Sequence, residues 1–166
     1  MKAKNMTRPF IKFLRDVYED RPVIGAEVGV LHGVNAEYIL RTLNIERLYL
    51  VDNDVKRAKF LKEEHGEKVI LLNGWSPGIA SKVTEPLDFV YIDAIHEYEP
   101  VLEDCRGWYP KLKRDGFLGG HDYFDRFPGL MRGVQEFASE VGKTIMSGVW
   151  DWWLVTEEQS IRYSSQ

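Results

Sequence analysis

One segment near the N-terminus constrains the fold of this chain more than any other. Residues 23–33 read Val-Ile-Gly-Ala-Glu-Val-Gly-Val-Leu-His-Gly, an apolar run followed by two spaced glycines. Such a run suits a strand covered on both faces, and Gly29 and Gly33 permit a tight turn close to a ligand. Asn35 is expected to cap a helix that runs to about Leu43. The pattern predicts a strand–turn–helix unit of the kind that holds nucleotide-like ligands, with an ordinary strand–turn–helix as the alternative.

The carboxylate of Glu27 makes this pattern Glu-x-Gly-x-x-x-Gly, which differs from the Gly-x-Gly-x-x-Gly of dinucleotide-binding folds. A pyrophosphate would be repelled by an acid at this position, whereas an ammonium or a sulfonium would be attracted. Glu27 therefore favours a positively charged ligand.

Length and composition indicate a single domain with a small-molecule ligand. The chain has 166 residues, 44% hydrophobic and 29% charged, with a net charge of −4 and a pI near 5.6. The acidic balance argues against nucleic-acid and membrane-surface partners, which need a basic footprint. No signal-like or membrane-spanning run occurs, so a cytoplasmic location is expected. The single cysteine, Cys105, excludes an intrachain disulfide and is expected to be a packed thiol.

Strand-like and helix-like segments alternate along most of the chain. A leading helix at about 7–20 precedes the glycine segment. Parallel strands are expected at 23–30, 47–52, 68–73, 87–93 and 116–120, with helices at 55–65, 98–113 and 130–141. Since strands joined by helices form parallel sheets, the chain is predicted to be a doubly wound α/β protein.

The C-terminal part departs from this alternation. Two strand-like runs at 143–147 and 151–156 are separated by only three residues, too few for a helical crossover. An antiparallel hairpin is therefore expected to make the sheet mixed. Trp150, Trp152 and Trp153 are interpreted as strand residues that pack on helices.

Polar residues follow the ends of the predicted strands. Because parallel strands end at the same edge of a sheet, these residues should meet there. Asp52 is placed to accept hydrogen bonds from ribose hydroxyls, or else begins a turn before Asn53. After the third strand, Trp75 is placed to stack on an adenine ring, while Ser76 and the backbone at Gly74 would bond its edge; simple packing of Trp75 is the alternative.

Two further carboxylates, Asp93 and Asp122, end the fourth and fifth strands, with His96 and His121 close by. Two acids aimed at one point repel each other unless a cation lies between them, and Mg²⁺ often takes one or two protein carboxylates. The pattern indicates a metal site, with caps of a helix and a turn as the alternative.

With these residues assembled, the chain resembles the class I S-adenosylmethionine-dependent methyltransferases. It looks most like a small family within that class whose motifs occur in order along the chain. They are Tyr-Ile-Asp-x-x-His-x-Tyr at 91–98, a Trp-x-Pro helix at 108–113 and Gly-x-x-x-Gly-His-Asp-Tyr at 116–123. The match covers nearly the whole chain after the leading helix. It implies a Rossmann-like sheet with strand order 3-2-1-4-5-7-6.

The resemblance also implies roles for the cofactor residues. Glu27, Gly29 and the turn through Gly33 would hold the methionine part and sulfonium of S-adenosylmethionine. Asp52, with Asn53 beside it, would bind ribose. The loop Gly74, Trp75, Ser76 would line the adenine, and Asp93 would border the cofactor.

A second set of roles follows from the catechol-type metal-dependent O-methyltransferases of the same class. There, an Asp and two adjacent polar residues bind the metal, and a basic residue three positions after the Asp deprotonates the substrate. Asp93, His121 and Asp122 fall on the metal positions, and His96 falls on the base. His121 stands where that group usually has a carboxylate, so Mg²⁺ and Mn²⁺ both stay candidates and His121 is a second candidate base.

The sequence thus predicts an S-adenosylmethionine-dependent O-methyltransferase of a small hydroxylated molecule, a sugar or secondary metabolite, with metal assistance. A homodimer is left open. The alternatives are an NAD-binding oxidoreductase, disfavoured by Glu27, and a binding protein that keeps the fold without chemistry.

Overall fold

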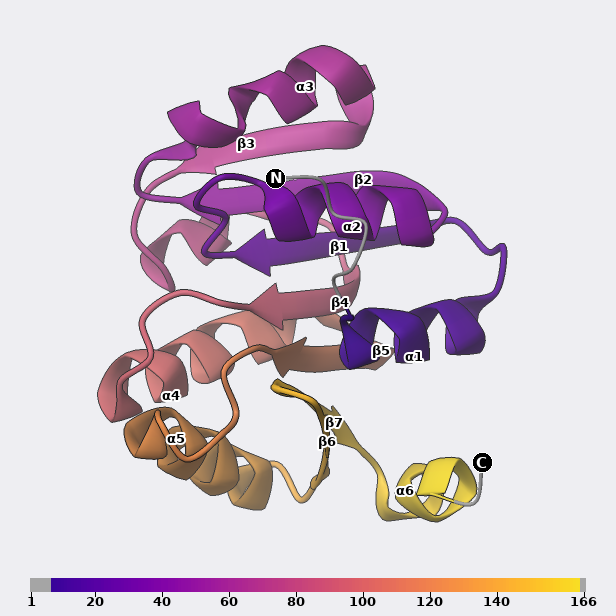
Figure 1. Cartoon of the computed structure of the whole chain (residues 1–166), viewed down its shortest axis with the longest axis vertical. Coiled ribbons are helices and arrows are strands. Elements are labelled where there is room, and N and C mark those ends of the chain that lie inside the picture. The colour runs from indigo at the N-terminus through magenta and orange to yellow at the C-terminus, as the bar shows by residue number, and fades with distance from the viewer. Residues whose placement is uncertain (1–6, 165–166) are drawn as a thin grey trace.

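The protein is built on one mixed β-sheet. The computed structural model describes residues 7–164, and within them the sheet has seven strands in the order β3-β2-β1-β4-β5-β7-β6 (Figure 1). The first five strands are parallel, and β7 runs antiparallel to both β5 and β6. Their bounds are β1 Val23–Val28, β2 Ile45–Asp52, β3 Val69–Asn73, β4 Leu87–Ile92, β5 Leu112–Gly120, β6 Thr144–Gly148 and β7 Asp151–Val155. The predicted fold class and strand order are confirmed.

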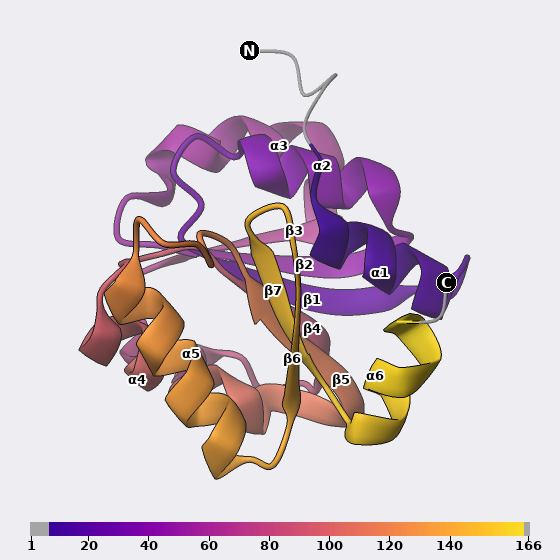
Figure 2. The ribbon, with the colours of Figure 1, turned by 60° about the horizontal axis from the view of Figure 1, so that its bottom comes forward.

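Helices cover both faces of the sheet (Figures 1 and 2). One apolar core joins the sheet to α1, α2 and α3, and a second core joins its other face to α4 and α5. The α-helices are α1 Pro9–Tyr18, α2 Val34–Thr42, α3 Lys59–His65, α4 Tyr98–Trp108, α5 Pro128–Glu140 and α6 Glu157–Ser164. Short 3₁₀ turns occupy Val55–Ala58, Gly66–Lys68, Gly78–Lys82 and Tyr109–Lys111. Among the described residues, none of the helices combines the length and apolarity needed to cross a membrane.

Several boundaries differ from those expected. The helix predicted at 98–113 ends at Trp108, because Pro110 lies in a 3₁₀ turn and β5 already starts at Leu112. The segment predicted as a helix at 55–65 begins as a 3₁₀ turn. Helix α6 was not anticipated, since its sequence is mostly polar.

Two individual predictions were wrong. Asn35 is not a helix cap: α2 begins one residue earlier, and its N-cap is Gly33, in the left-handed conformation. Trp152 and Trp153 are buried strand residues, but Trp150 lies in the β6–β7 turn and is half exposed. Since β6 ends at Gly148 and β7 begins at Asp151, Trp150 is one of the two residues of the turn between them.

The contact between β1 and β4 shapes the carboxyl edge of the sheet. Asp93 N donates to Val28 O over 2.7 Å, and Gly29 N donates to Val51 O over 2.8 Å. Gly29 has φ +88°, and a Cβ there would overlap the carbonyl oxygen of Asp93. Only glycine lets the chain turn this close to its neighbour.

Replacing Gly29 with alanine should destabilise the protein more than a positive φ alone explains. The conformation by itself costs about 1–3 kcal/mol, and the overlap with backbone adds to it because the Asp93 carbonyl cannot rotate away. Gly66→Ala is the matched control, since Gly66 has φ +59° and open space around its missing Cβ. Thermal unfolding of both variants measures the difference; equal losses would show that the β1–β4 contact yields to the added methyl group.

Candidate functional site

A cavity of about 600 Å³ opens at the carboxyl ends of the parallel strands. This volume lies in the range typical of small-molecule sites. The predicted site residues that line it are Glu27, Gly29, Asp52, Asn53, Gly74, Trp75, Ser76, Asp93, His96, His121 and Asp122. Gly33 is not among the lining residues. The cavity is also lined by Arg8, Asn35 and Asp104, which the sequence analysis did not select.

The turn after β1 is organised by Asp52. Its Oδ2 accepts hydrogen bonds from the backbone N–H groups of Val30, at 2.9 Å, and Leu31, at 3.0 Å. Its Oδ1 accepts one from Asp54 N at 2.9 Å. Burial alone would raise the pKa of Asp52, but these N–H donors outweigh it and the pKa is lowered. Asp52 is therefore an ionised group that fixes the turn, and its predicted bond to ribose remains a prediction.

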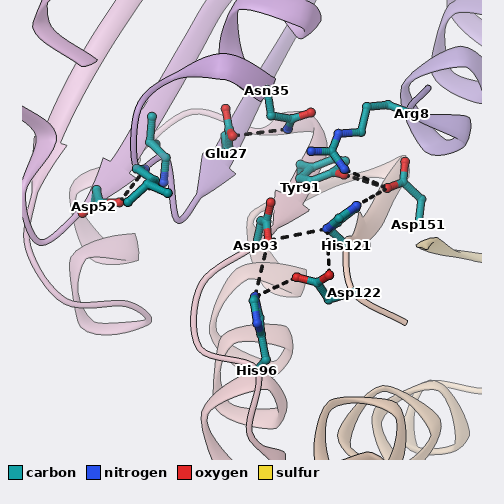
Figure 3. A network of polar contacts seen from close by, with 12 residues as sticks. Arg8, Glu27, Asn35, Asp52, Tyr91, Asp93, His96, His121, Asp122 and Asp151 are labelled. Atoms are coloured by element: carbon teal, nitrogen blue, oxygen red, sulfur yellow. Dashed lines mark hydrogen bonds and ion pairs between the residues drawn. The ribbon is translucent and has the colours of Figure 1, made fainter. Parts of the chain in front are cut away.

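Glu27 lies at the floor of the cavity and is only 1% exposed. Its Oε1 accepts a hydrogen bond from Asn35 Nδ2 at 3.2 Å, while Oε2 has no partner among the described residues (Figure 3). Burial, and next the nearby charge of Asp93, raise its pKa well above the ordinary value. Asn35 therefore hydrogen-bonds the carboxylate at the floor of the cavity. A cationic ligand would supply a partner for Oε2 of Glu27.

Glu27→Gln should make the ligand-free protein more stable at neutral pH. An acid with a raised folded-state pKa loses its proton more readily when unfolded, so its contribution to stability falls as pH rises above about 4.3. Glutamine has nearly the shape of glutamate but does not ionise, so the variant does not lose stability in this way as the pH rises. The melting temperature of the variant should therefore exceed that of the wild type by a margin that grows between pH 5 and pH 8.

The control is Glu67→Gln, because the side chain of Glu67 is fully exposed. A margin for Glu27→Gln that stays constant with pH would contradict a raised pKa at Glu27.

Two acids and a histidine meet at the other end of the cavity. His96 Nε2 lies 3.1 Å from Asp122 Oδ2 and 3.5 Å from Asp93 Oδ1 (Figure 3). Hydrogen bonding to the Asp93 carboxylate, with the imidazole as the donor, raises the pKa of His96 against the effect of burial, and the charges of Asp122 and Asp93 add to the rise. Asp122 has φ +61°, a conformation uncommon outside glycine that turns the chain sharply just after β5.

This cluster fits a divalent cation. One ligand atom each from Asp93, His96 and Asp122 lies within 4.8 Å of the others. Carboxylate oxygens with an imidazole nitrogen form a donor set that several divalent metals accept. The geometry groups His96 with the acids, whereas the resemblance placed His121 in the metal set.

His121 lies behind this cluster, between two carboxylates. Its Nδ1 is 3.2 Å from Asp122 Oδ1 and 4.0 Å from Asp93 Oδ1. Its Nε2 faces Asp151 Oδ1 at 3.9 Å (Figure 3). The imidazole is therefore oriented by the protein toward Asp122.

Asp151 was missed by the sequence analysis, although it is the centre of a buried network. It is 1% exposed and accepts hydrogen bonds from Phe10 N at 3.1 Å and Tyr91 OH at 2.8 Å. Arg8 Nη1 lies 3.9 Å from it. Asp151 joins the start of α1 to β4 and β7, and in the sequence it is an isolated acid between tryptophans that gives no motif.

Aromatic side chains border the acidic end of the cavity. Phe127 meets His96 edge to face at 4.7 Å between ring centroids, and Trp150 meets His121 at 6.0 Å. Trp150 also stacks on Phe124 at 5.2 Å. The two histidines thus stand against a half-exposed aromatic wall.

Another buried acid lies near the Gly74–Ser76 loop. The Ser76 hydroxyl donates to Asp104 Oδ1 and accepts a hydrogen bond from Trp108 Nε1 at 2.8 Å. Asp104 is 3% exposed, and burial raises its pKa to about 6. The hydroxyl of Ser76 is therefore committed within the protein, which makes its predicted bond to adenine less available.

The strand order and the antiparallel strand β7 are those of the class I methyltransferase fold. Residues 26–123, more than half of the chain, match the family model described as a methyltransferase domain. The chain belongs to this methyltransferase family.

Solved structures with the same fold span most of the chain. A precorrin-6y C5,15-methyltransferase from Geobacter metallireducens superposes with a TM-score of 0.70 at 12% identity, over 93% of this chain and 91% of that one. An O-methyltransferase from Bacillus cereus in complex with S-adenosylhomocysteine (SAH) gives 0.69 at 15% identity, over 92% and 84%. The TDP-rhamnose 3′-O-methyltransferase CalS11 gives 0.67 at 16% identity, over 87% and 76%.

A curated relative is more similar in sequence. Uncharacterized protein R132 of Acanthamoeba polyphaga mimivirus is 21% identical, over 77% of this chain. The chain spans 65% of the length of that relative.

Proposed function

We propose that this methyltransferase uses S-adenosylmethionine to methylate a hydroxyl group of a small molecule, with help from a divalent cation. One observation carries the proposal. A single cavity joins the Glu27–Asp52 end to the Asp93–His96–Asp122 end. A methyl donor held at the first end would present its methyl group to an acceptor at the second, so the protein supplies proximity and alignment.

The first end suits the methyl donor. S-adenosylmethionine carries an ammonium and a sulfonium, and the open Oε2 of Glu27 complements a positive charge. Asp52 accepts hydrogen bonds from the backbone of the glycine turn and so fixes the turn that would contact the donor. The family match and the SAH complex of the Bacillus cereus enzyme support this placement.

The second end suits an acceptor hydroxyl. Asp93 and Asp122 would hold the cation, with His121 as a further donor, and a cation bound there would lower the pKa of the acceptor hydroxyl. His96 lies against both acids and is positioned to take the hydroxyl proton. Asp93 and Asp122 orient its imidazole.

The acceptor we propose is small, a sugar or secondary metabolite. The acidic chain and the limited size of the cavity support a small molecule over a nucleic acid. The similarity to O-methyltransferases, one of them acting on TDP-rhamnose, also supports this class.

SAH should stabilise the protein and NAD should not, because the floor of the cavity is acidic. At one hundred times its dissociation constant a ligand adds about 2.7 kcal/mol. For a domain of this size, that stabilisation corresponds to a rise in melting temperature of roughly 5–11 °C. A thermal shift with NAD and none with SAH would overturn the cofactor assignment in favour of an oxidoreductase.

Mn²⁺ should bind at the acid cluster, as measured by electron paramagnetic resonance of the free ion. Asp93→Asn and Asp122→Asn should each weaken binding by more than about tenfold, since each removes a charged ligand. Because we assign His121 as the further donor, His121→Ala should weaken it, though less than the aspartate variants do. Because we assign His96 as the base, His96→Ala should leave it nearly unchanged, although the geometry also places His96 within reach of a cation. Asp125→Asn is the control, because Asp125 is exposed on the neighbouring loop.

The role of His96 is then separable from metal binding. Transfer of a labelled methyl group to a panel of phenols, catechols and sugars should fall by about 10²–10⁴ in His96→Ala, the usual loss for a positioned base. Loss of Mn²⁺ binding in this variant would make His96 a ligand instead. SAH binding without transfer to any acceptor would fit the non-catalytic binding protein.

A further inference from the structure

Arg8, the residue just before helix α1, is a cation to which neither end of the cavity has yet given a role. Among the described residues that line the cavity, it is the only arginine or lysine. Its side chain is 13% exposed, and its buried Nε has no hydrogen-bond partner within the part of the chain that the structure describes. Burying an N–H group of a charged guanidinium without a partner costs free energy. An acidic group on a ligand would remove this cost.

The ion pair with Asp151 engages the guanidinium of Arg8 only weakly. Arg8 Nη1 lies 3.9 Å from Asp151 Oδ1, which is longer than a hydrogen bond. The carboxylate of Asp151 already accepts hydrogen bonds from Phe10 N and Tyr91 OH. Burial raises the pKa of Asp151, and the charge of Arg8 offsets that rise less than these two hydrogen bonds do. Arg8 is therefore held beside Asp151 but can still donate to another partner.

The position of Arg8 relates it to the acceptor end of the cavity. Arg8 Nη1 and His121 Nε2 both lie 3.9 Å from the same oxygen, Oδ1 of Asp151, where their dashed lines meet in Figure 3. His121 Nδ1 in turn faces Asp122, one of the two acids to which we assign the cation. Burial raises the pKa of Glu27 at the donor end, and the charge of Arg8 offsets this only from a distance, since no ion pair within 4.0 Å joins the two residues.

We propose that Arg8 binds an acidic group of the acceptor, a carboxylate or a phosphate, so that the substrate is a hydroxylated acid rather than a neutral sugar or phenol. The proposal rests on the proposed function, since it takes the acceptor hydroxyl to lie at the acid cluster. A guanidinium binds carboxylate and phosphate oxygens through two parallel hydrogen bonds, which fix orientation as well as affinity. An acceptor held both at its hydroxyl and at its acidic group would present one particular hydroxyl to the methyl group.

The test compares acids with their neutral amides, which have nearly the same shape. In the presence of SAH and Mn²⁺, calorimetry should show that the wild type prefers the acid in at least one of two pairs: 3,4-dihydroxybenzoate over 3,4-dihydroxybenzamide, and glucuronate over glucuronamide. The expected preference is about tenfold or more, the range for a hydrogen bond between charged groups. Arg8→Gln should reduce it to within about threefold. Arg8→Lys should keep part of it, because an ammonium retains the charge but lacks the two parallel donors.

Arg15→Gln is the matched control. It removes the same charge from α1, but Arg15 is half exposed and does not line the cavity. Its preference for the acid should equal that of the wild type.

A second arm asks whether the acidic group that Arg8 binds belongs to the donor. Arg8→Gln should bind SAH within about threefold of the wild type. A loss of about tenfold or more for SAH, with no loss for decarboxylated SAH, would assign Arg8 to the carboxylate of the donor and overturn the proposal.

The remaining outcomes separate this proposal from the proposed function. Equal binding of acid and amide by the wild type in both pairs would overturn the role of Arg8, and so would binding of none of the four compounds. An unchanged preference in Arg8→Gln would overturn it as well. Each of these results leaves the donor assignment standing as long as SAH binds, whereas failure of SAH to bind the wild type contradicts the proposed function itself. The wild-type comparisons decide the matter even if removal of the charge beside Asp151 prevents a variant from folding.

Discussion

The backbone contact between β1 and β4 is the constraint on which the site depends. Gly29 passes so close to Asp93 that no side chain fits between them, and this brings the glycine turn and the acid cluster into the lining of one cavity. The donor and the acceptor of a group-transfer reaction can then bind side by side in one cavity. Had the turn stood further from β4, the groups would remain but lie too far apart to act on one pair of molecules.

Many acids lie in the lining of the cavity or beside it, and each is balanced differently. Asp52 is held by backbone N–H groups, and Asp93 and Asp122 face histidines. Asp151 receives a tyrosine hydroxyl and a backbone N–H. Glu27 keeps one oxygen without a protein partner. The groups that the protein leaves least satisfied are the ones that a positively charged or N–H-bearing ligand would complete.

Periodicity was sufficient to predict the parallel strands and the antiparallel hairpin, and the family resemblance supplied their order. All of the predicted site residues except Gly33 line the cavity, because glycine turns and strand-end acids are local signals. What escaped prediction depends on tertiary packing. Asp151 stands between two tryptophans and Asp104 stands beside Glu103 in a helix, so neither spacing nor neighbours mark them. Trp150 belongs to the two-residue turn that precedes β7. Asn35 is of a residue type that often caps helices. In the structure its side chain instead donates a hydrogen bond to Glu27, eight residues earlier in the sequence.

The network around Asp151 has a consequence for how the protein acquires its site. Phe10 and Asp151 are 141 positions apart, yet they form one buried hydrogen bond beside the cavity. Since α1 comes long before β7 along the chain, Arg8 and Tyr91 have no buried carboxylate to face until the hairpin has formed. Contacts between such distant parts of a chain form slowly. The strands that carry the glycine turn can pair early, but Asp151, which faces Nε2 of His121, reaches its place only when β7 packs beside α1.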